Sequence, residues 1–374
     1  MGEKRKPVPA EVAKKLWVKA GGRCEYEGCN KLLYRDSLTE QEMNTSYIAH
    51  VVSASVDGPR GHLKRSKELE KDLGNLMLLC DVCHRRIDRE QLDEHPEARL
   101  LKMKKDHEGR IELVTAITAE KKSHIIIYTA KVGDYEVSVQ YKQAAYAMIP
   151  ERFPASDRPL QLGLSNSMDN DFSESYWNIQ LQQLETSFNY FIRPLLGHDP
   201  VQDFSVFAFA PQPLLIKLGS LLSDKYPSDV YQYHRSNSSW KWKEEGEAQE
   251  FKLIEPSNMS GTPTLVFSLS GTINRRHVQA AVEGCSIWEI NIENPYNDHL
   301  CLKDMLPSFK KTARKAIDKI SQSHGNGPLH IFPAMPVSAA VELGKLRMAK
   351  ADMPWIIYDY NNKNHQFFKA VTIQ

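Results

Sequence analysis

The sequence predicts a two-part α/β protein in which a small zinc-framed N-terminal module precedes a larger domain of alternating strands and helices. Two observations carry this prediction. Four of the 6 cysteines fall in two close pairs in the N-terminal part of the chain. From residue 124 onward, short apolar runs alternate with amphipathic stretches, which is typical of α/β units around a largely parallel sheet. A polar segment near residues 120–123 marks the boundary, giving domains at 1–122 and 123–374.

The composition is that of a globular protein, with 41% hydrophobic and 25% charged residues in 374. No apolar run approaches the ~18 residues of a membrane-spanning helix. The N-terminal residues MGEKRK precede no apolar signal-peptide core. We therefore expect a cytoplasmic protein with no membrane partner. Cys285 and Cys301 stand alone in apolar surroundings, which favours reduced core thiols.

The two cysteine pairs have the spacing of a structural zinc site. Cys24 and Cys29 form a C-x4-C pair, and Cys80 and Cys83 form a C-x2-C pair. Four thiolates are a common ligand set for a closed zinc tetrahedron, and a redox pair is the alternative. A zinc ion would tie both pairs together and supply a rigid scaffold that so small a module cannot build from its own core.

Periodicity and turn signals predict five elements in this module. They are a helix over residues 9–20, a strand over 46–52, a turn over 71–75, a helix over 80–90 and a long polar helix over 91–122. The strand contains His50, and the helix that starts at residue 80 contains Cys80, Cys83 and His84 in its first turn.

His50 and Asn75 lie between the two cysteine pairs, and His84 directly follows Cys83, so a zinc ion bound by the four cysteines would hold all three side chains in one small module. This arrangement resembles the HNH nuclease motif, a ββα-metal fold in which a strand histidine faces a helix histidine across one metal ion. The resemblance implies that His50 is the general base, that Asn75 holds the turn and orients His50, and that His84 binds Mg²⁺ or a similar ion. Histidine titrates near neutral pH, and a divalent cation stabilises charge on the phosphate, so these residues suit phosphodiester hydrolysis.

The motif departs from many HNH enzymes at one position. Those enzymes place an acidic or histidine ligand directly before the base, where this sequence has Ala49. Asp88, one helical turn after His84, or Asp57 would then supply an oxygen ligand, or water and the scissile phosphate would hold the ion. Basic residues near the motif are candidate phosphate contacts: Lys64, Arg65, Lys67, Arg85, Arg86 and Arg89.

In the larger domain, the alternation predicts two Rossmann-like halves. Strands are expected over residues 124–129, 136–140, 204–209, 230–234, 264–270, 287–292, 329–332 and 355–360. Helices are expected over residues 175–196, 213–225, 275–283, 306–323 and 337–350. The sequence has no P-loop and no G-x-G-x-x-G, so nucleoside triphosphates and dinucleotide cofactors are not indicated.

Four segments of this domain follow one another in a distinctive order. They are FAFAPQPLLIKLG at residues 207–219, YQYHR at 231–235 with WKW at 240–242, FSLSGTI at 267–273 and FPAMPVS at 332–338. Their order resembles the SAVED domain, over about residues 124–374. The resemblance implies a fusion of two CARF-like halves that senses cyclic oligonucleotide second messengers.

A cyclic dinucleotide presents flat bases and two phosphates, so its site should combine aromatic rings, arginine and small residues at strand-to-helix turns. Ligands of open α/β sheets bind at the carboxyl ends of strands. The candidate contacts are Tyr233, Arg235, Trp240, Trp242, Ser268, Ser270, Thr272, Arg275 (or its neighbour Arg276) and Ser338. The alternative is that one of the two tryptophans belongs to the core and that the Ser-Gly turns are structural.

Together the two parts resemble the HNH–SAVED effectors of CBASS antiphage systems. The resemblance implies that a cyclic nucleotide from a partner cyclase binds the SAVED domain and switches on cleavage of double-stranded DNA by a zinc- and Mg²⁺-containing HNH endonuclease. The ligand would stabilise a homo-oligomer in which two HNH modules face one duplex.

Two alternatives remain. One is a constitutive HNH restriction-type nuclease, which needs a basic second domain, although residues 123–374 carry 24 Lys and Arg against 26 Asp and Glu. The other is a ligand-responsive, non-enzymatic DNA binder with a degenerate HNH module, which Ala49 motivates.

Overall fold

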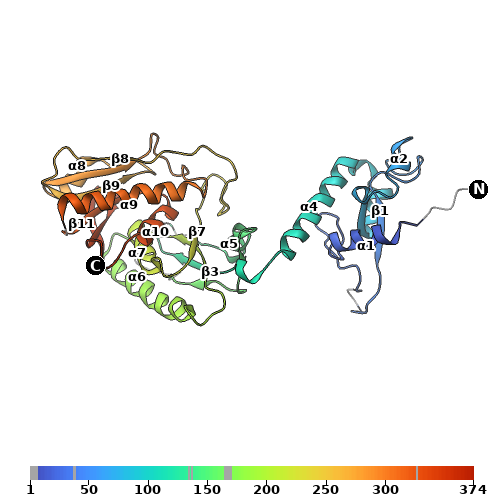
Figure 1. Ribbon diagram of the computed structural model, residues 1–374, viewed down its shortest axis with the longest axis horizontal. Coiled ribbons are helices and arrows are strands. Elements are labelled where there is room, and N and C mark those ends of the chain that lie inside the picture. The colour runs from blue at the N-terminus through green and yellow to red at the C-terminus, as the bar shows by residue number, and fades with distance from the viewer. Residues whose placement is uncertain (1–6, 37–38, 134, 136–137, 164–170, 326) are drawn as a thin grey trace, which may run out of the picture. The chain divides into compact units, whose positions relative to one another are not determined.

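The computed structural model describes residues 7–36, 39–133, 135, 138–163, 171–325 and 327–374 (Figure 1). The chain forms two compact units, Met1–Ile117 and Thr118–Gln374, which we describe separately. The first six residues, on which the signal-peptide expectation depends, lie outside the described residues. Within the described ranges, no helix has both the length and the apolar character needed to cross a bilayer.

The first unit contains two paired strands among helices. Its elements are α1 (Ala10–Lys19), β1 (Ser46–His50), α2 (Arg65–Glu68), β2 (Leu76–Cys80), α3 (Asp81–Arg85) with a π-helical turn (Arg86–Glu90), and α4 (Glu97–Thr115). β1 and β2 pair antiparallel, with Ser46 opposite Cys80 and His50 opposite Leu76. All of β2 is buried in the unit's core. The helices predicted over residues 9–20 and 80–90 and the strand predicted over 46–52 are found, but the helix predicted over 91–122 is shorter. It begins only after Pro96, which has no N–H for an earlier helical turn, and it ends at Thr115.

The second unit is built on two sheets. In the first sheet, β4, β3, β6 and β7 lie in that order, β5 also pairs with β3, and all pairs are parallel. In the second sheet the order is β13-β12-β11-β9-β10-β8, with antiparallel pairs only at the two edges. The strands are β3 (Lys122–Thr129), β4 (Phe153–Pro154), β5 (Leu160–Gln161), β6 (Phe204–Phe209), β7 (Ser228–Val230), β8 (Lys252–Ile254), β9 (Thr262–Ser268), β10 (Cys285–Asn291), β11 (Leu329–Ala334), β12 (Trp355–Asn361) and β13 (Gln366–Ile373).

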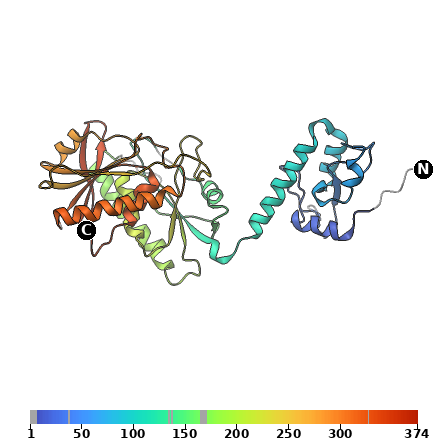
Figure 2. The same ribbon diagram turned by 45° about the horizontal axis from the view of Figure 1, so that its top comes forward.

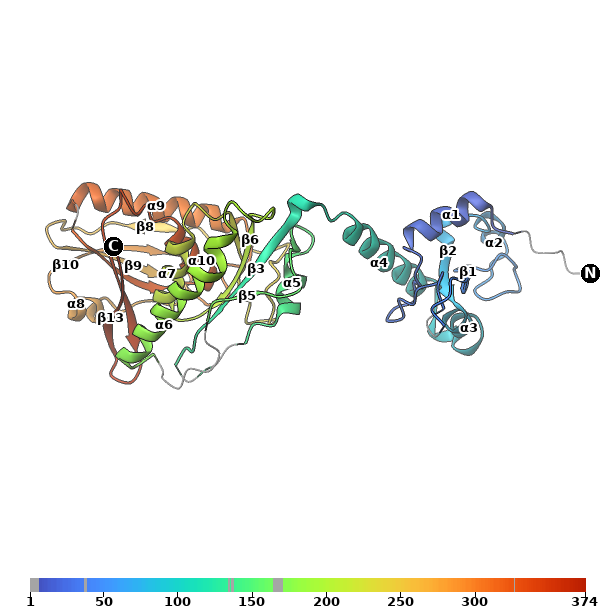
Figure 3. The same ribbon diagram turned by 90° about the horizontal axis from the view of Figure 1, so that it is seen from below.

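Helices cover both faces of each sheet. They are α5 (Tyr141–Met148), α6 (Glu174–Ser187), α7 (Gln212–Leu222), α8 (Arg275–Ala281), α9 (Met305–His324) and α10 (Val337–Lys345). α7 and α10 pack side by side between the sheets, as Figure 3 shows. α9, the long orange helix in Figure 2, packs on β8, β9 and β10. α5 and α8 cover the outer faces of the first and second sheets. The predicted α/β architecture is therefore confirmed.

The structure differs from the sequence-based expectations in both units. Of the strand expected over residues 136–140, residues 136 and 137 lie outside the described residues and the rest is irregular. The strand expected over residues 230–234 ends instead at Val230. The sequence did not predict α2, β2, β4, β5 and α5, nor β8 and β13, the antiparallel edges of the second sheet. Buried parallel strands form near-continuous apolar runs, whereas the edge strands mix polar and apolar residues, so the sequence signal of the edges is weaker.

Two glycines allow α7 and α10 to touch through their backbones. A Cβ on Gly219 would lie 2.0 Å from the Val341 carbonyl oxygen, and a Cβ on Gly344 would lie 2.0 Å from the Ile216 carbonyl oxygen. Neither carbonyl can move without moving its helix, so only glycine fits at this crossing. α7 follows β6 of the first sheet and α10 follows β11 of the second, so this crossing joins the two halves.

We expect Gly344→Ala to destabilise the second unit by about 1–3 kcal/mol, the usual cost of forcing extra volume into a closely packed contact. Denaturant unfolding of the full chain, followed by circular dichroism, measures the change. Gly271→Ala is the matched control, because a Cβ there meets no atom within 4 Å. Equal unfolding midpoints for the two variants would contradict a backbone contact between α7 and α10.

Candidate functional site

The four paired cysteines converge on one point in the first unit. Their sulfur atoms all lie within 4.8 Å of one another, and no other group of three or more His, Cys, Asp or Glu side chains in the described ranges does so. The Cys29 and Cys80 sulfurs are 3.9 Å apart. Tetrahedral zinc with Zn–S bonds of about 2.3 Å separates its sulfurs by about 3.8 Å. The cluster therefore fits a zinc ion.

Asn75 fixes the chain that directly follows His50. Its buried amide donates hydrogen bonds to the carbonyl oxygens of Val52 (2.9 Å) and Leu69 (3.1 Å), and its carbonyl oxygen accepts the Val52 N–H at 2.8 Å. His50 lies at the end of β1, and its Nε2 is 3.0 Å from the Glu70 carbonyl oxygen. Because a carbonyl oxygen only accepts, Nε2 carries the proton and the lone pair of the neutral ring is on Nδ1.

His84 projects from α3 beside an acidic side chain. Its Nε2 is 3.3 Å from Asp88 Oδ2, and its ring stacks on Tyr47 with centroids 5.2 Å apart. Of the two oxygen donors that the sequence offered, Asp88 is therefore the one adjacent to His84, whereas Asp57 is exposed. Ala49 is 1% exposed and contributes no ligand atom.

Arg60 connects β1 to the helix that bears His84. Its guanidinium donates to the Val51 carbonyl at 2.6 Å, to the Ile87 carbonyl at 2.8 Å and to Asp88 Oδ1 at 2.6 Å. Burial alone would raise the pKa of Asp88, but hydrogen bonds from His84 and Arg60 bring this pKa below its usual value. Asp88 is thus a charged carboxylate held between a cation and an imidazole.

Three of the six basic residues predicted to contact phosphate interact with other side chains of the first unit. Arg65 pairs with Glu97, and Arg85 pairs with Asp81 at 2.7 Å. The guanidinium carbon of Arg86 lies 5.3 Å from the centre of the Tyr26 ring. Within the part of the chain that the structure describes, no ion pair involves the other three predicted phosphate contacts, Lys64, Lys67 and Arg89.

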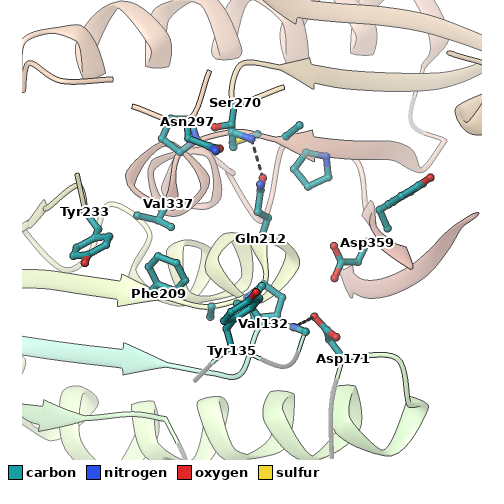
Figure 4. A pocket seen from close by; sticks show the side chains of 18 of the residues that line it. Val132, Tyr135, Asp171, Phe209, Gln212, Tyr233, Ser270, Asn297, Val337 and Asp359 are labelled. Carbon is teal, nitrogen blue, oxygen red and sulfur yellow. Dashed lines mark hydrogen bonds between the residues drawn. The ribbon is translucent and has the colours of Figure 1, made fainter. Parts of the chain in front are cut away.

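The second unit has a pocket of about 710 Å³ at the carboxyl ends of strands from both sheets. Figure 4 shows Phe209 at the end of β6, Asp359 near the end of β12, and Val132 after β3, all facing this space. The pocket is also lined by Tyr135, Asp171, Phe172, Gln212, Gln232, Tyr233, Arg235, Ser270, Asn297, Asp298, Val337, Tyr360 and Lys363. Its position follows the rule that ligands of open α/β sheets bind beyond the strands' carboxyl ends.

α7 and α10 both begin at this pocket, directly after Pro211 and Pro336. Helix N-termini carry unpaired N–H groups and a positive partial charge, which suits anions such as phosphate. Two glutamines crosslink the halves here. Gln212 accepts the Met335 N–H at 3.1 Å, and Gln232 accepts the Ser338 hydroxyl at 2.8 Å.

Three of the nine predicted ligand contacts line the pocket, namely Tyr233, Arg235 and Ser270. Ser338 is buried behind it and reaches it only through its hydrogen bond to Gln232. Thr272 is exposed and does not line the pocket.

The other four predicted contacts have structural partners. Trp240 is 2% exposed and packs edge-on against Phe207. Trp242 lines a separate cavity of about 290 Å³. Ser268 donates to Glu289 at 2.7 Å, and Arg275 pairs with the same carboxylate at 2.7 Å. The strand-end argument identified the correct edge, but the pleat and these polar pairs turn several side chains away from the pocket.

Several aromatic and acidic pocket residues were not among the predicted contacts. Tyr135 is 79% exposed on the rim, and Phe172, Phe209 and Tyr360 supply further rings. Asp359 and Tyr360 lie near the end of a correctly predicted strand, so the strand-end rule contained the signal for them. Tyr135 follows β3 in an irregular segment, and nothing in its neighbourhood marked it.

The pocket's charges are arranged unevenly. Arg235 and Lys363 are basic, and Asp171, Asp298 and Asp359 are acidic. Asp298 accepts the backbone N–H groups of Arg235 (3.1 Å) and Ser236 (2.9 Å), and thereby shapes the loop. Burial, reinforced by the charge of Asp171, raises the pKa of Asp359 to about 7.

Comparison with known proteins gives one family match. Residues 184–373 match the SAVED family, described as "SMODS-associated and fused to various effectors sensor domain". No curated protein matches the chain.

Distant likenesses to solved structures include the Acinetobacter baumannii Cap4 SAVED/CARF-domain containing receptor with the cyclic trinucleotide 2'3'3'-cAAA (12% identity, 74% of this chain and 55% of that chain, TM-score 0.43). The Moraxella osloensis Cap4 receptor is also similar (13% identity, 76% of this chain and 63% of that chain, TM-score 0.43). The chain thus spans less than two thirds of these relatives' own length. Because the family match covers more than half of its residues, the chain belongs to the SAVED family of sensor domains.

Proposed function

We propose that the chain is a metal-dependent DNA endonuclease that a cyclic oligonucleotide activates by binding to the SAVED domain. The observation that carries the sensor half is the pocket at which the carboxyl strand ends of both sheets meet the N-termini of α7 and α10. A volume of about 710 Å³ lies within the usual range of ligand pockets, about 300–1,000 Å³.

The pocket's chemistry supports a ligand that combines phosphates with aromatic bases. Phosphates fit the guanidinium of Arg235 and the positive ends of the two helix dipoles, because each carries positive charge. Bases fit the rings of Tyr135 and Tyr233, since every base has a flat face on which an aromatic side chain stacks. A cyclic dinucleotide or trinucleotide contains both components in one compact molecule.

Two histidines of the first unit support the proposed nuclease activity, His50 through its tautomer and His84 through the carboxylate beside it. The hydrogen bond to Glu70 leaves the lone pair of a neutral His50 on Nδ1, the tautomer that accepts a proton from an attacking water. Cis ligands of an octahedral Mg²⁺ with bonds of about 2.1 Å lie about 3 Å apart. His84 Nε2 and Asp88 Oδ2 lie 3.3 Å apart in a hydrogen bond, so an ion that displaces the proton between them would be held by both side chains. Such an ion supplies positive charge for the phosphate and the leaving oxygen.

We propose that ligand binding stabilises a homo-oligomer that brings two nuclease modules to one DNA duplex. A ligand shifts an equilibrium only by its preference for one state. The pocket is built from both halves of the second unit, so an occupant that contacts both halves favours the arrangement in which they match it. The chain is then nearly inactive without ligand.

Plasmid cleavage in Mg²⁺ tests this function. We expect cleavage only in the presence of one member of a panel of cyclic di- and trinucleotides, and loss of cleavage in His50→Ala with DNA binding retained. His198→Ala is the control, because His198 is an exposed histidine of the other unit. Cleavage by the wild type without ligand would support a constitutive nuclease. No cleavage under any condition, with DNA binding retained, would support a non-enzymatic binder.

Zinc removal tests the cysteine cluster. We expect native mass spectrometry to show one zinc ion per chain, absent in Cys24→Ser and retained in Cys285→Ser, whose cysteine lies outside the cluster. Loss of zinc should unfold the first unit while ligand binding by the second unit persists, because a structural zinc contributes folding free energy. A metal-free wild type that keeps its full circular dichroism signal and cleavage activity would contradict a structural zinc site.

A rim tyrosine tests the pocket. Tyr135→Ala should weaken binding of the activating cyclic nucleotide by roughly 5- to 150-fold, since stacking of a base on an aromatic ring is worth about 1–3 kcal/mol. Tyr146→Ala is the matched control, because Tyr146 is 74% exposed, like Tyr135 at 79%, but does not line the pocket. Isothermal titration calorimetry measures the affinity of both variants for the cyclic nucleotide. Equal affinities of Tyr135→Ala and Tyr146→Ala would show that no base stacks on Tyr135.

A further inference from the structure

A turn after β1 holds one residue in an unusual backbone conformation. The turn runs from Gly58 through Pro59 and Arg60 to Gly61, and the Gly61 N–H donates to the Gly58 carbonyl oxygen at 2.9 Å. Arg60, at the third position, has a φ of 55°, in the left-handed region that glycine or asparagine normally occupies there. This conformation costs free energy in a residue with a branched path of heavy atoms beyond Cα, so the surrounding structure must maintain it.

The turn is also too closely packed to relax. A Cβ on Gly61 would lie 2.2 Å from the Val56 carbonyl oxygen and 2.6 Å from the Ser55 carbonyl oxygen. The chain therefore folds back on its own backbone at the residue that follows Arg60. Backbone strain of this kind is typical of functional positions, and the question is what the turn achieves.

The turn directs the guanidinium of Arg60 into the protein. The Arg60 side chain is 10% exposed. Its Nε donates to the Val51 carbonyl oxygen at 2.6 Å, its Nη1 to the Ile87 carbonyl oxygen at 2.8 Å and its Nη2 to Asp88 Oδ1 at 2.6 Å. Each of the three nitrogens thus has an acceptor within the first unit. A guanidinium that is engaged in this way differs from the exposed basic side chains nearby, which have their charge in solvent.

These contacts assign different partners to the two oxygens of Asp88. Oδ1 accepts from Arg60, and Oδ2 lies beside His84 Nε2 at 3.3 Å. An ion beside His84 therefore meets one oxygen of Asp88 rather than both. Partners that orient the ligands of a metal in this way commonly change metal affinity or activity by about 10- to 100-fold when they are lost.

We propose that Arg60 is a positioning residue of the nuclease centre, which fixes Asp88 so that Oδ2 alone faces the metal ion beside His84, and that Arg60 does not contact DNA. The strained turn is maintained because it directs this guanidinium inward. The inference rests on the proposed nuclease function and adds a residue to the three that the HNH motif supplies.

Metal affinity tests the positioning role. Mn²⁺ is the probe, titrated into the full-length, zinc-loaded protein without DNA, and electron paramagnetic resonance measures the free ion. We expect one Mn²⁺ site that His84→Ala removes, and we expect Arg60→Lys to weaken it roughly 10- to 100-fold. Lysine keeps the positive charge, but its compact ammonium does not serve three acceptors as a planar guanidinium does.

Arg99→Lys is the matched control for Mn²⁺ binding. Arg99 also belongs to the first unit and also pairs with a carboxylate, that of Glu27, while it donates to the Glu94 carbonyl oxygen at 2.7 Å. We expect this variant to bind Mn²⁺ as the wild type does. Zinc content and circular dichroism show whether each variant is folded.

DNA affinity distinguishes positioning from phosphate contact in a second variant. Arg60→Gln removes the charge, and we expect the dependence of its DNA affinity on salt concentration to equal that of the wild type. Loss of one phosphate contact reduces the slope of log affinity against log salt by about 1. Lys67→Gln is the comparison, because Lys67 is exposed and is a predicted phosphate contact. Fluorescence anisotropy of a labelled duplex measures both variants.

Equal Mn²⁺ affinities of the wild type and Arg60→Lys would overturn the role of Arg60 and leave the nuclease function standing. A reduced salt slope in Arg60→Gln would overturn it as well, since the guanidinium would then contact a phosphate. Loss of zinc from Arg60→Lys would also overturn it, because Arg60 would then serve the fold of the whole unit. A wild type without a Mn²⁺ site that depends on His84 would overturn the proposed metal centre itself.

Discussion

The backbone contact between α7 and α10 is the constraint on which the second unit depends. Gly219 and Gly344 each stand where a side chain would collide with a carbonyl oxygen of the opposite helix. α7 extends from the first sheet and α10 from the second, and both helices begin at the pocket. Close packing at the crossing therefore helps to set how near the two N-termini lie to each other, and with it the spacing of the two helix ends that the proposed ligand's phosphates would face.

Polar contacts at the pocket extend this connection between the halves. Gln212, at the start of α7, accepts an N–H from the segment before α10, and Gln232, beyond β7, accepts the hydroxyl of Ser338 in the first turn of α10. Each glutamine thus belongs to one half and satisfies a donor in the other. A ligand that touches both halves acts on a surface whose parts are linked, so it favours one arrangement of the halves as a whole.

Much of the fold was predictable from sequence because buried parallel strands and amphipathic helices leave strong periodic signals. The four cysteines were predictable for a similar reason, since spacing alone indicates a metal site. The residues that line the pocket were less predictable. Ser268 and Trp240 stand at sequence positions as suitable as that of Tyr233, yet Ser268 binds Glu289 and Trp240 packs on Phe207. Which side of a strand end faces the ligand depends on distant partners, and a single sequence does not show those partners.

The first unit suggests where regulation acts in the proposed nuclease. Asn75 holds the chain next to His50 by three hydrogen bonds, and Arg60 ties that same segment to Asp88 beside His84. These contacts lie within the first unit and involve no residue of the sensor. Buried hydrogen bonds of this kind are costly to break, so the histidines keep their places whether or not the sensor is occupied. Activation by a ligand therefore acts on DNA access or on the assembly of modules, rather than on the geometry of the centre.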